Sequence, residues 1–220
     1  KGGSARALIV NAGNSNAFTG HRGREAVEQI VAQVATALGC RDEEVFVSST
    51  GVIGVPLPRD KAREGVAAVL KADPCGWETA ARAIGTTDTF TKGAGASAMI
   101  GATRVELAGF IKGSGMIAPD MATMLVYIFT DAAIDRPVLQ SMVSANADLT
   151  FNCITVDSDT STSDTLLCAA TGASGVRVTE KDTAFIDALR GVMLDLAHQV
   201  VKDGEGATKF VRIAVTGAGS

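Results

Sequence analysis

The chain has 220 residues, of which 46% are hydrophobic and 20% charged, so it can bury the core of one large domain or two small ones. Its formal net charge of −4 argues against nucleic acid or an anionic membrane surface as its partner. No apolar stretch reaches the roughly 20 residues that cross a bilayer, so we expect no membrane-spanning segment.

Four cysteines stand far apart without a Cys-x-x-Cys pair, and only two histidines accompany them. This spacing argues against a zinc site, and so low a cysteine content argues against a disulfide framework. We therefore expect no metal, and free thiols buried in a protein of the reducing cytoplasm. The cysteines are Cys40, Cys75, Cys153 and Cys168.

Strand and helix patterns alternate in the first part of the chain, which indicates an α/β or α+β fold. A short apolar run predicts a strand at residues 7–10, and a second strand at residues 45–47 runs into a polar turn. An apolar stripe over residues 26–38 recurs every three or four positions and predicts a helix that Gly39 terminates. Pro58 opens a helix to about residue 70, and residues 77–84 predict a short one.

The rest of the chain is rich in strand formers and small residues and contains the longest helix. Its predicted elements are strands at residues 105–111 and 124–130, a helix from Asp135 and Pro137 to about residue 147, a buried strand at 153–156, a helix at 164–170, the long helix from a Thr179 cap to about residue 202, and a strand at 209–216.

Two carboxylates, Asp157 and Asp159, follow the strand predicted at residues 153–156. Aspartate-nucleophile phosphatases place two carboxylates in this way, one to attack phosphorus and one as general acid, around Mg²⁺. Ser161 departs from their pattern, and few residues remain for their other charged groups. We therefore favour a polar loop with Ser and Thr caps.

Two glycine patterns, at residues 93–95 and 113–115, match the start of a dinucleotide-binding fingerprint. The second one follows a strand, but the apolar run after it predicts another strand where the fingerprint needs a helix N-terminus. We interpret these glycines as a tight turn between strands. A Ser-His-Asp hydrolase is disfavoured because no Gly-x-Ser-x-Gly elbow is present.

Residues 112–125 (KGSGMIAPDMATML) join a glycine-rich loop, a proline turn and a threonine at the start of an apolar strand. The hydroxyl of Thr123 could attack the carbonyl of Ala122 if the loop strains that peptide bond, and hydrolysis of the ester would make Thr123 a new N-terminus. Its amine could then act as general base for its own hydroxyl. Composition alone does not single out this segment, since a Thr before a strand is usually structural.

The same segment resembles the self-processing motif of the ornithine acetyltransferase family, also called bifunctional glutamate N-acetyltransferases or arginine-biosynthesis J proteins. Four further blocks agree in order: residues 11–20 (NAGNSNAFTG), 48–54 (SSTGVIG), 157–161 (DSDTS) and 203–209 (DGEGATK). The resemblance implies a four-layer α/β/β/α sandwich over residues 1–204 and the start of a C-terminal domain at 205–220. We expect the chain to be an internal piece of a longer protein, since the family's first strands and most of that domain are missing.

The resemblance also implies roles for individual residues. Thr123 resembles the nucleophile released by cleavage after Ala122, and Asp120 stands where the family often has Asn. The remaining implied residues are Thr50 and Gly51 for the oxyanion hole, and Thr89, Lys112, Thr123 and Glu205 for substrate binding.

The implied reaction is transfer of an acetyl group from N2-acetylornithine to glutamate through acetyl-Thr123, which yields ornithine and N-acetylglutamate without a metal or cofactor. Acetyl-CoA stays open as a second donor. The implied assembly is a dimer of processed protomers, each made of two self-cleaved chains, hence a heterotetramer in the cytoplasm. The alternatives are a related self-processing N-terminal-nucleophile amidase or aminopeptidase and an inactive small-molecule binding protein.

Overall fold

A parallel strand pair covered by two helices forms the N-terminal part of the computed structural model, which describes residues 3–118 and 124–217. Strand β1 (Ala7–Asn14) pairs with β2 (Val45–Val52), with Ala7 opposite Val45. The crossover is helix α1 (Gly20–Leu38) with the 3-10 turn η1 (Asp42–Glu44), and α2 (Arg59–Val69) follows β2. Gly39 ends α1 in the left-handed conformation, as predicted.

A four-stranded sheet in the order β3-β4-β5-β7 forms the second part. Its strands are β3 (Lys92–Ile100), β4 (Thr103–Lys112), β5 (Leu125–Thr130) and β7 (Thr165–Ala170). Neighbours are antiparallel except β5 and β7, which run parallel. One face is covered by α4 (Arg136–Asp148) and α5 (Thr183–Lys202), and a small pair, β6 (Ala133–Ile134) with β8 (Arg177–Val178), lies beside it.

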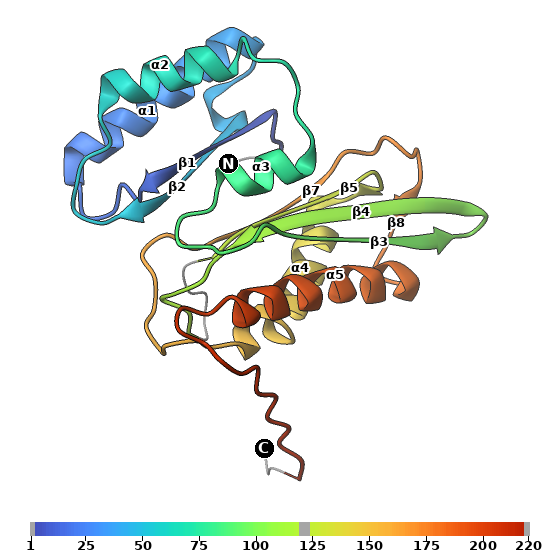
Figure 1. Cartoon of the computed structure of the whole chain (residues 1–220). Helices are drawn as coiled ribbons and strands as arrows, with labels where there is room; N and C mark the ends of the chain where they lie inside the picture. The colour runs from blue at the N-terminus through green and yellow to red at the C-terminus, as the bar shows by residue number, and fades with distance from the viewer. Residues whose placement is uncertain (1–2, 119–123, 218–220) are drawn as a thin grey trace.

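Three apolar clusters show how these parts stack. The first lies between α1, α2 and the β1-β2 pair, and another lies between the four-stranded sheet and α4 with α5. The third brings Leu8 and Val10 of β1 against Phe110 and Tyr127 of the large sheet, with helix α3 (Trp77–Ala83) at its side. The two sheets therefore face each other between outer helices (Figure 1), and the predicted four-layer α/β/β/α arrangement of an α+β protein is confirmed.

Several local predictions are wrong, each where the pattern is short. Residues 165–170, part of the helix expected at 164–170, form β7, because so short an apolar run does not show a period and the buried strand β5 offers a partner along its whole length. The strand expected at residues 153–156 is replaced by the 3-10 turn η2 (Phe151–Cys153) and irregular backbone. Strand β3 is not predicted as a separate element, although it lies in the part of the chain that is rich in strand formers and small residues.

The strand predicted at residues 209–216 is also absent, because no strand among the described residues lies beside it to accept its hydrogen bonds. Its apolar side chains are exposed, and the segment extends away from the helices and sheets (Figure 1). The cysteines are free as expected, but the predicted burial is wrong: Cys75 and Cys153 are exposed, and Cys40 and Cys168 are half-buried. Over the part of the chain that the structure describes, no helix combines the length and apolar character needed to cross a membrane.

Candidate active site

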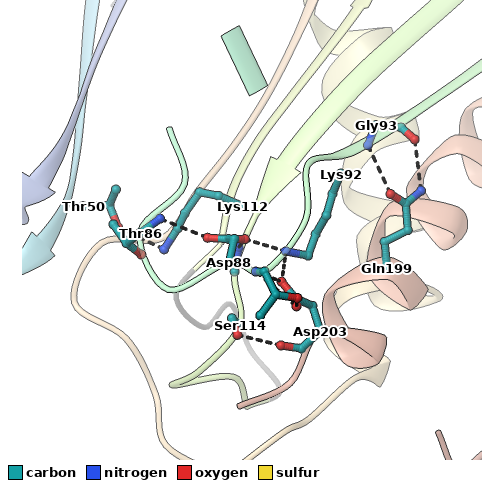
Figure 2. A network of polar contacts seen from close by, with 11 residues as sticks. Thr50, Thr86, Asp88, Lys92, Gly93, Lys112, Ser114, Gln199 and Asp203 are labelled. Atoms are coloured by element: carbon teal, nitrogen blue, oxygen red, sulfur yellow. Dashed lines mark hydrogen bonds and ion pairs between the residues drawn. The ribbon is translucent and has the colours of Figure 1, made fainter. Parts of the chain in front are cut away.

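Thr50 and Lys112, which lie on different sheets, meet in the interior of the molecule. Thr50 is on β2 with 1% of its surface exposed, and Lys112 is the last residue of β4 with 3% exposed. The Lys112 Nζ donates a hydrogen bond to Thr50 Oγ1 at 3.2 Å (Figure 2). The fold thus brings a residue expected in the oxyanion hole together with one expected to bind substrate.

Gly51 follows Thr50 at a point where only glycine fits. Its φ is +126°, and a Cβ at this position would lie 2.4 Å from the carbonyl carbon of Gly13 on β1. An L-residue would therefore be strained and would collide with backbone rather than with a movable side chain. The close approach of β1 sets the direction of the chain immediately after Thr50.

Thr89 lies just before β3 and is held by a carboxylate from the far end of the chain. Its hydroxyl donates to Asp203 Oδ1, and its backbone N–H donates to Asp203 Oδ2 at 3.0 Å. Asp203 directly follows α5 as its C-cap. Because the Thr89 proton points to Asp203, the free lone pairs of its oxygen can only accept a hydrogen bond.

A buried lysine connects these groups. Lys92 has no exposed side-chain surface, and its Nζ lies 2.5 Å from both Asp88 Oδ1 and Asp203 Oδ2 (Figure 2). Asp88 also accepts a hydrogen bond from the backbone N–H of Gly113, at 2.8 Å. One cation therefore ties the segment of Thr89 to the end of α5 and, through Asp88, to the loop after Lys112.

Glu205 is attached to that same loop. The hydroxyl of Ser114 donates to the backbone oxygen of Asp203 at 2.6 Å, and the N–H of Glu205 donates to the backbone oxygen of Ser114 at 2.8 Å. The Glu205 carboxyl lies against Gly115, where a Cβ would be 3.0 Å from its Cδ. Glu205 is exposed, so its charge faces solvent beside the loop.

The electrostatics of the site centre on Lys112. Burial is the main cause that lowers the pKa of Lys112, and the charge of Lys92 acts in the same direction. The carboxylates of Asp88, Asp164 and Glu205 oppose this by favouring the ammonium form. Lys112 is therefore a desolvated amine whose charge is balanced at a distance by several acids.

Ala122 and Thr123 lie outside the described residues, but the chain on both sides of them is anchored by aspartates. Asp157 accepts hydrogen bonds from the N–H groups of Met116 and Ile117, at 2.6 and 2.9 Å. Asp164 Oδ1 accepts one from the N–H of Met124 at 3.0 Å, and burial raises the pKa of Asp164 to about 6.

These contacts decide between the alternatives for two motifs. Asp157 binds loop amides with both carboxylate oxygens, and residues 154–164 form neither helix nor strand, so the loop interpretation is confirmed. The expected tight turn is wrong for both glycine patterns: residues 93–95 lie inside β3, and residues 113–115 open the long connection from β4 to β5. No helix begins in the described part of that connection, which agrees with the argument against a dinucleotide site.

Comparison with known proteins adds a family to this geometry. A model of the ArgJ family matches residues 1–220, the whole chain. The chain belongs to the ArgJ family. This agrees with the resemblance to ornithine acetyltransferases seen in the sequence motifs.

Curated relatives of this ArgJ-family chain carry the name arginine biosynthesis bifunctional protein ArgJ. The one from Ruegeria pomeroyi is 59% identical over 213 residues, which are 96% of this chain and 52% of the relative. The one from Zymomonas mobilis is 56% identical over 223 residues, 99% of this chain and 54% of the relative. The chain thus spans about half the length of these relatives.

A crystal structure of arginine biosynthesis bifunctional protein argJ from Bacillus halodurans is 37% identical. It matches 52% of this chain and 61% of its own, with a TM-score of 0.48.

Sequence reasoning named the ends of the polar network but missed its centre. Thr50, Lys112, Thr89 and Glu205 came from the family resemblance. In the structure Thr50 contacts Lys112, Thr89 contacts Asp203, and Glu205 contacts the loop that follows Lys112. The connecting residues are Asp88, Lys92, Ser114 and Asp203. One signal in the sequence could have indicated this centre: Lys92 follows Asp88 by four residues and begins β3, a strand of small residues.

Proposed function

We propose that this ArgJ-family chain supplies the nucleophile and most of the active site of an acetyltransferase of arginine biosynthesis in the cytoplasm. The reaction moves an acetyl group from N2-acetylornithine to glutamate, with Thr123 as the carrier. The observation that carries the proposal is the buried contact between Lys112 Nζ and Thr50 Oγ1, at 3.2 Å. It aligns a hydroxyl donor and a cation at the end of the strand that precedes the Thr123 loop.

The first step is self-cleavage. The Thr123 hydroxyl attacks the carbonyl carbon of Ala122, the peptide C–N bond breaks, and water hydrolyses the ester. This leaves a carboxylate on Ala122 and a free amine on Thr123. An α-amine has an ordinary pKa of about 8, so its neutral form can take the proton of the adjacent hydroxyl. The anchoring of Met116, Ile117 and Met124 supports this step because it holds both flanks of the bond in place.

The second step is acetyl transfer. The Thr123 oxygen attacks the acetyl carbonyl of acetylornithine, and a tetrahedral oxyanion forms before the C–N bond breaks. The proton taken from Thr123 goes to the leaving amine of ornithine. Thr50 and Gly51 are the oxyanion donors in this proposal, and losing one such donor typically costs a factor of about 100 to 1,000 in turnover. Glutamate then attacks the acetyl ester in the reverse sense.

The amino-acid part of both substrates contacts the groups around Lys112. An α-carboxylate suits the Lys112 ammonium, and an α-nitrogen suits the acceptor oxygen of Thr89 and the carboxylate of Glu205. Because ornithine and glutamate share these two groups, one pocket can hold them in turn. This predicts ping-pong kinetics, in which ornithine leaves before glutamate binds.

The test is an acetyl-transfer assay on the whole protein, including any sequence that flanks these residues. We expect parallel double-reciprocal lines and, with acetylornithine alone, an acetyl mass on the fragment that begins at Thr123. Thr123→Ala should stay uncut and inactive. Intersecting lines without a modified fragment would contradict the acetyl-enzyme. Hydrolysis to acetate would indicate an amidase, and binding without turnover an inactive pocket.

Three further parts of the proposal need their own measurements. A parallel assay with acetyl-CoA and glutamate decides whether the enzyme has a second donor. Mass spectrometry and light scattering should find two chains per protomer and a dimer of protomers. Limited proteolysis after residue 204 tests the boundary between the sandwich and a C-terminal domain that begins at Glu205.

A further inference from the structure

The contact between Lys112 and Thr50 has a definite hydrogen-bond polarity. An ammonium group carries three N–H donors and no acceptor, so Thr50 Oγ1 must accept in the 3.2 Å contact. A threonine hydroxyl that already accepts from a cation keeps its own proton free to donate in another direction. Both side chains are almost fully buried, so bulk water does not compete for either group.

The charges around Lys112 are arranged to keep this polarity. Among the described residues, no carboxylate reaches ion-pair distance of the Lys112 Nζ, which instead donates a hydrogen bond to the Thr50 hydroxyl (Figure 2). The groups that act on it from farther away are Asp88 and Lys92 from the β3 side, Asp164 before β7 and Glu205 after α5. Three acids against one cation favour the ammonium form, although burial opposes it.

Thr89 makes the opposite arrangement. Its hydroxyl donates to the Asp203 carboxylate, so its oxygen can only accept from a ligand. The two threonines of one network therefore have opposite roles, and in each case a buried charged partner decides which.

We propose that Lys112 is a positioning residue of the oxyanion hole: by donating to Thr50 Oγ1 it keeps the Thr50 hydroxyl proton directed toward the oxyanion. This inference rests on the proposed function and extends it, since the resemblance gives Lys112 only a contact with substrate. No proton is transferred in this role. The remaining N–H donors of Lys112 stay available for the substrate carboxylate, so the two roles are compatible.

A double-mutant cycle in the whole protein separates the two roles. Thr50→Val removes the donor and should lower kcat about 100-fold. Lys112→Met keeps the length of the side chain but frees the Thr50 hydroxyl to rotate, and should lower kcat about 10-fold. The double variant should have the kcat of Thr50→Val alone, because Lys112 then has no hydroxyl to orient. Any rise in KM from the lost carboxylate contact should be the same in both backgrounds.

Controls address charge and folding. Lys61→Met removes an exposed cation of α2 and should leave kcat unchanged. Thr50→Ser keeps a hydroxyl and should retain most of the turnover with Lys112 present but lose about 10-fold with Lys112→Met. Losses in kcat that multiply to about 1,000-fold in the double variant would overturn the inference and leave Lys112 with a substrate contact only.

A titration independent of activity completes the test. The side-chain NMR signal of Lys112 in lysine-labelled protein, assigned by its loss in Lys112→Met, should titrate about one pH unit lower in Thr50→Val, which lacks the acceptor. An unchanged titration would overturn the contact. If the wild type cleaves itself but transfers no acetyl group, the proposed function fails, and this titration still decides whether Lys112 donates to Thr50.

Discussion

Replacing Lys92 by Met should destabilise the protein more than any other single charge removal in the network. The Lys92 side chain has no exposed surface, and its two partners are nearly as buried, with 9% of the Asp88 side chain and 1% of the Asp203 side chain accessible. Removing one member of a buried ion pair typically costs about 3–5 kcal/mol, because the remaining charge is left without compensation.

The other contacts of Asp88 and Asp203 determine how much of this loss of about 3–5 kcal/mol occurs in Lys92→Met. Asp203 keeps the hydroxyl and N–H of Thr89, and Asp88 keeps the N–H of Gly113. Methionine fills nearly the same volume as the lysine stem, so no cavity forms. The contact of the Lys92 ammonium with the Phe90 ring, 4.8 Å from its centroid, adds a smaller loss. We therefore expect the free energy of unfolding to fall by about 3 kcal/mol.

Urea unfolding followed by circular dichroism measures this change in the free energy of unfolding. Lys71→Met, at an exposed position after α2, is the matched control and should change it by less than about 0.5 kcal/mol. Adding Asp203→Asn to Lys92→Met removes one uncompensated charge and should restore at least about 1 kcal/mol. A loss below about 1 kcal/mol in Lys92→Met, or no recovery in the double variant, would refute the ion-pair reasoning.

Three further outcomes follow from single contacts in the site. Gly51→Ala should lower the free energy of unfolding by at least about 3 kcal/mol, because the added Cβ would lie 2.4 Å from a backbone atom. Gly54→Ala, measured in the same urea assay, should lower it by only about 1 kcal/mol, because Gly54 has a φ of +80° but open space around it. Burial raises the pKa of Asp164 from 3.8 to about 6, so ionisation of Asp164 destabilises the fold as the pH rises through this window. At pH 7.5 the free energy of unfolding of Asp164→Asn should exceed that of the wild type by about 1 kcal/mol, a value that allows for partial exposure of the side chain. Near pH 3.5 the two unfolding curves should coincide. Thr89→Val removes a hydrogen-bond acceptor for the substrate nitrogen, so it should raise the KM for acetylornithine about 10-fold and leave kcat nearly unchanged. A fall in kcat of about 10-fold would refute the role of Thr89 as an acceptor for the substrate.

Local signals in the sequence determined most helices and the class of the fold. The apolar stripe of α1, the proline at the start of α2 and the proline in the first turn of α4 act within a few residues of each other, so their effect does not depend on the rest of the chain. Motif blocks likewise indicated Thr50, Gly51 and Lys112, because a family pattern is a property of the sequence itself.

Only the tertiary structure decided what depends on distant partners. Residues 165–170 form a strand because β5 lies alongside, while residues 209–216 have no neighbouring strand among the described residues, form no regular structure and expose their apolar side chains. Lys92 and Asp203 are 111 positions apart, and Lys112 and Thr50 are 62 apart. Periodicity and capping report on neighbours a few residues away, whereas the pairing of buried charges is set by which surfaces the packed layers bring together.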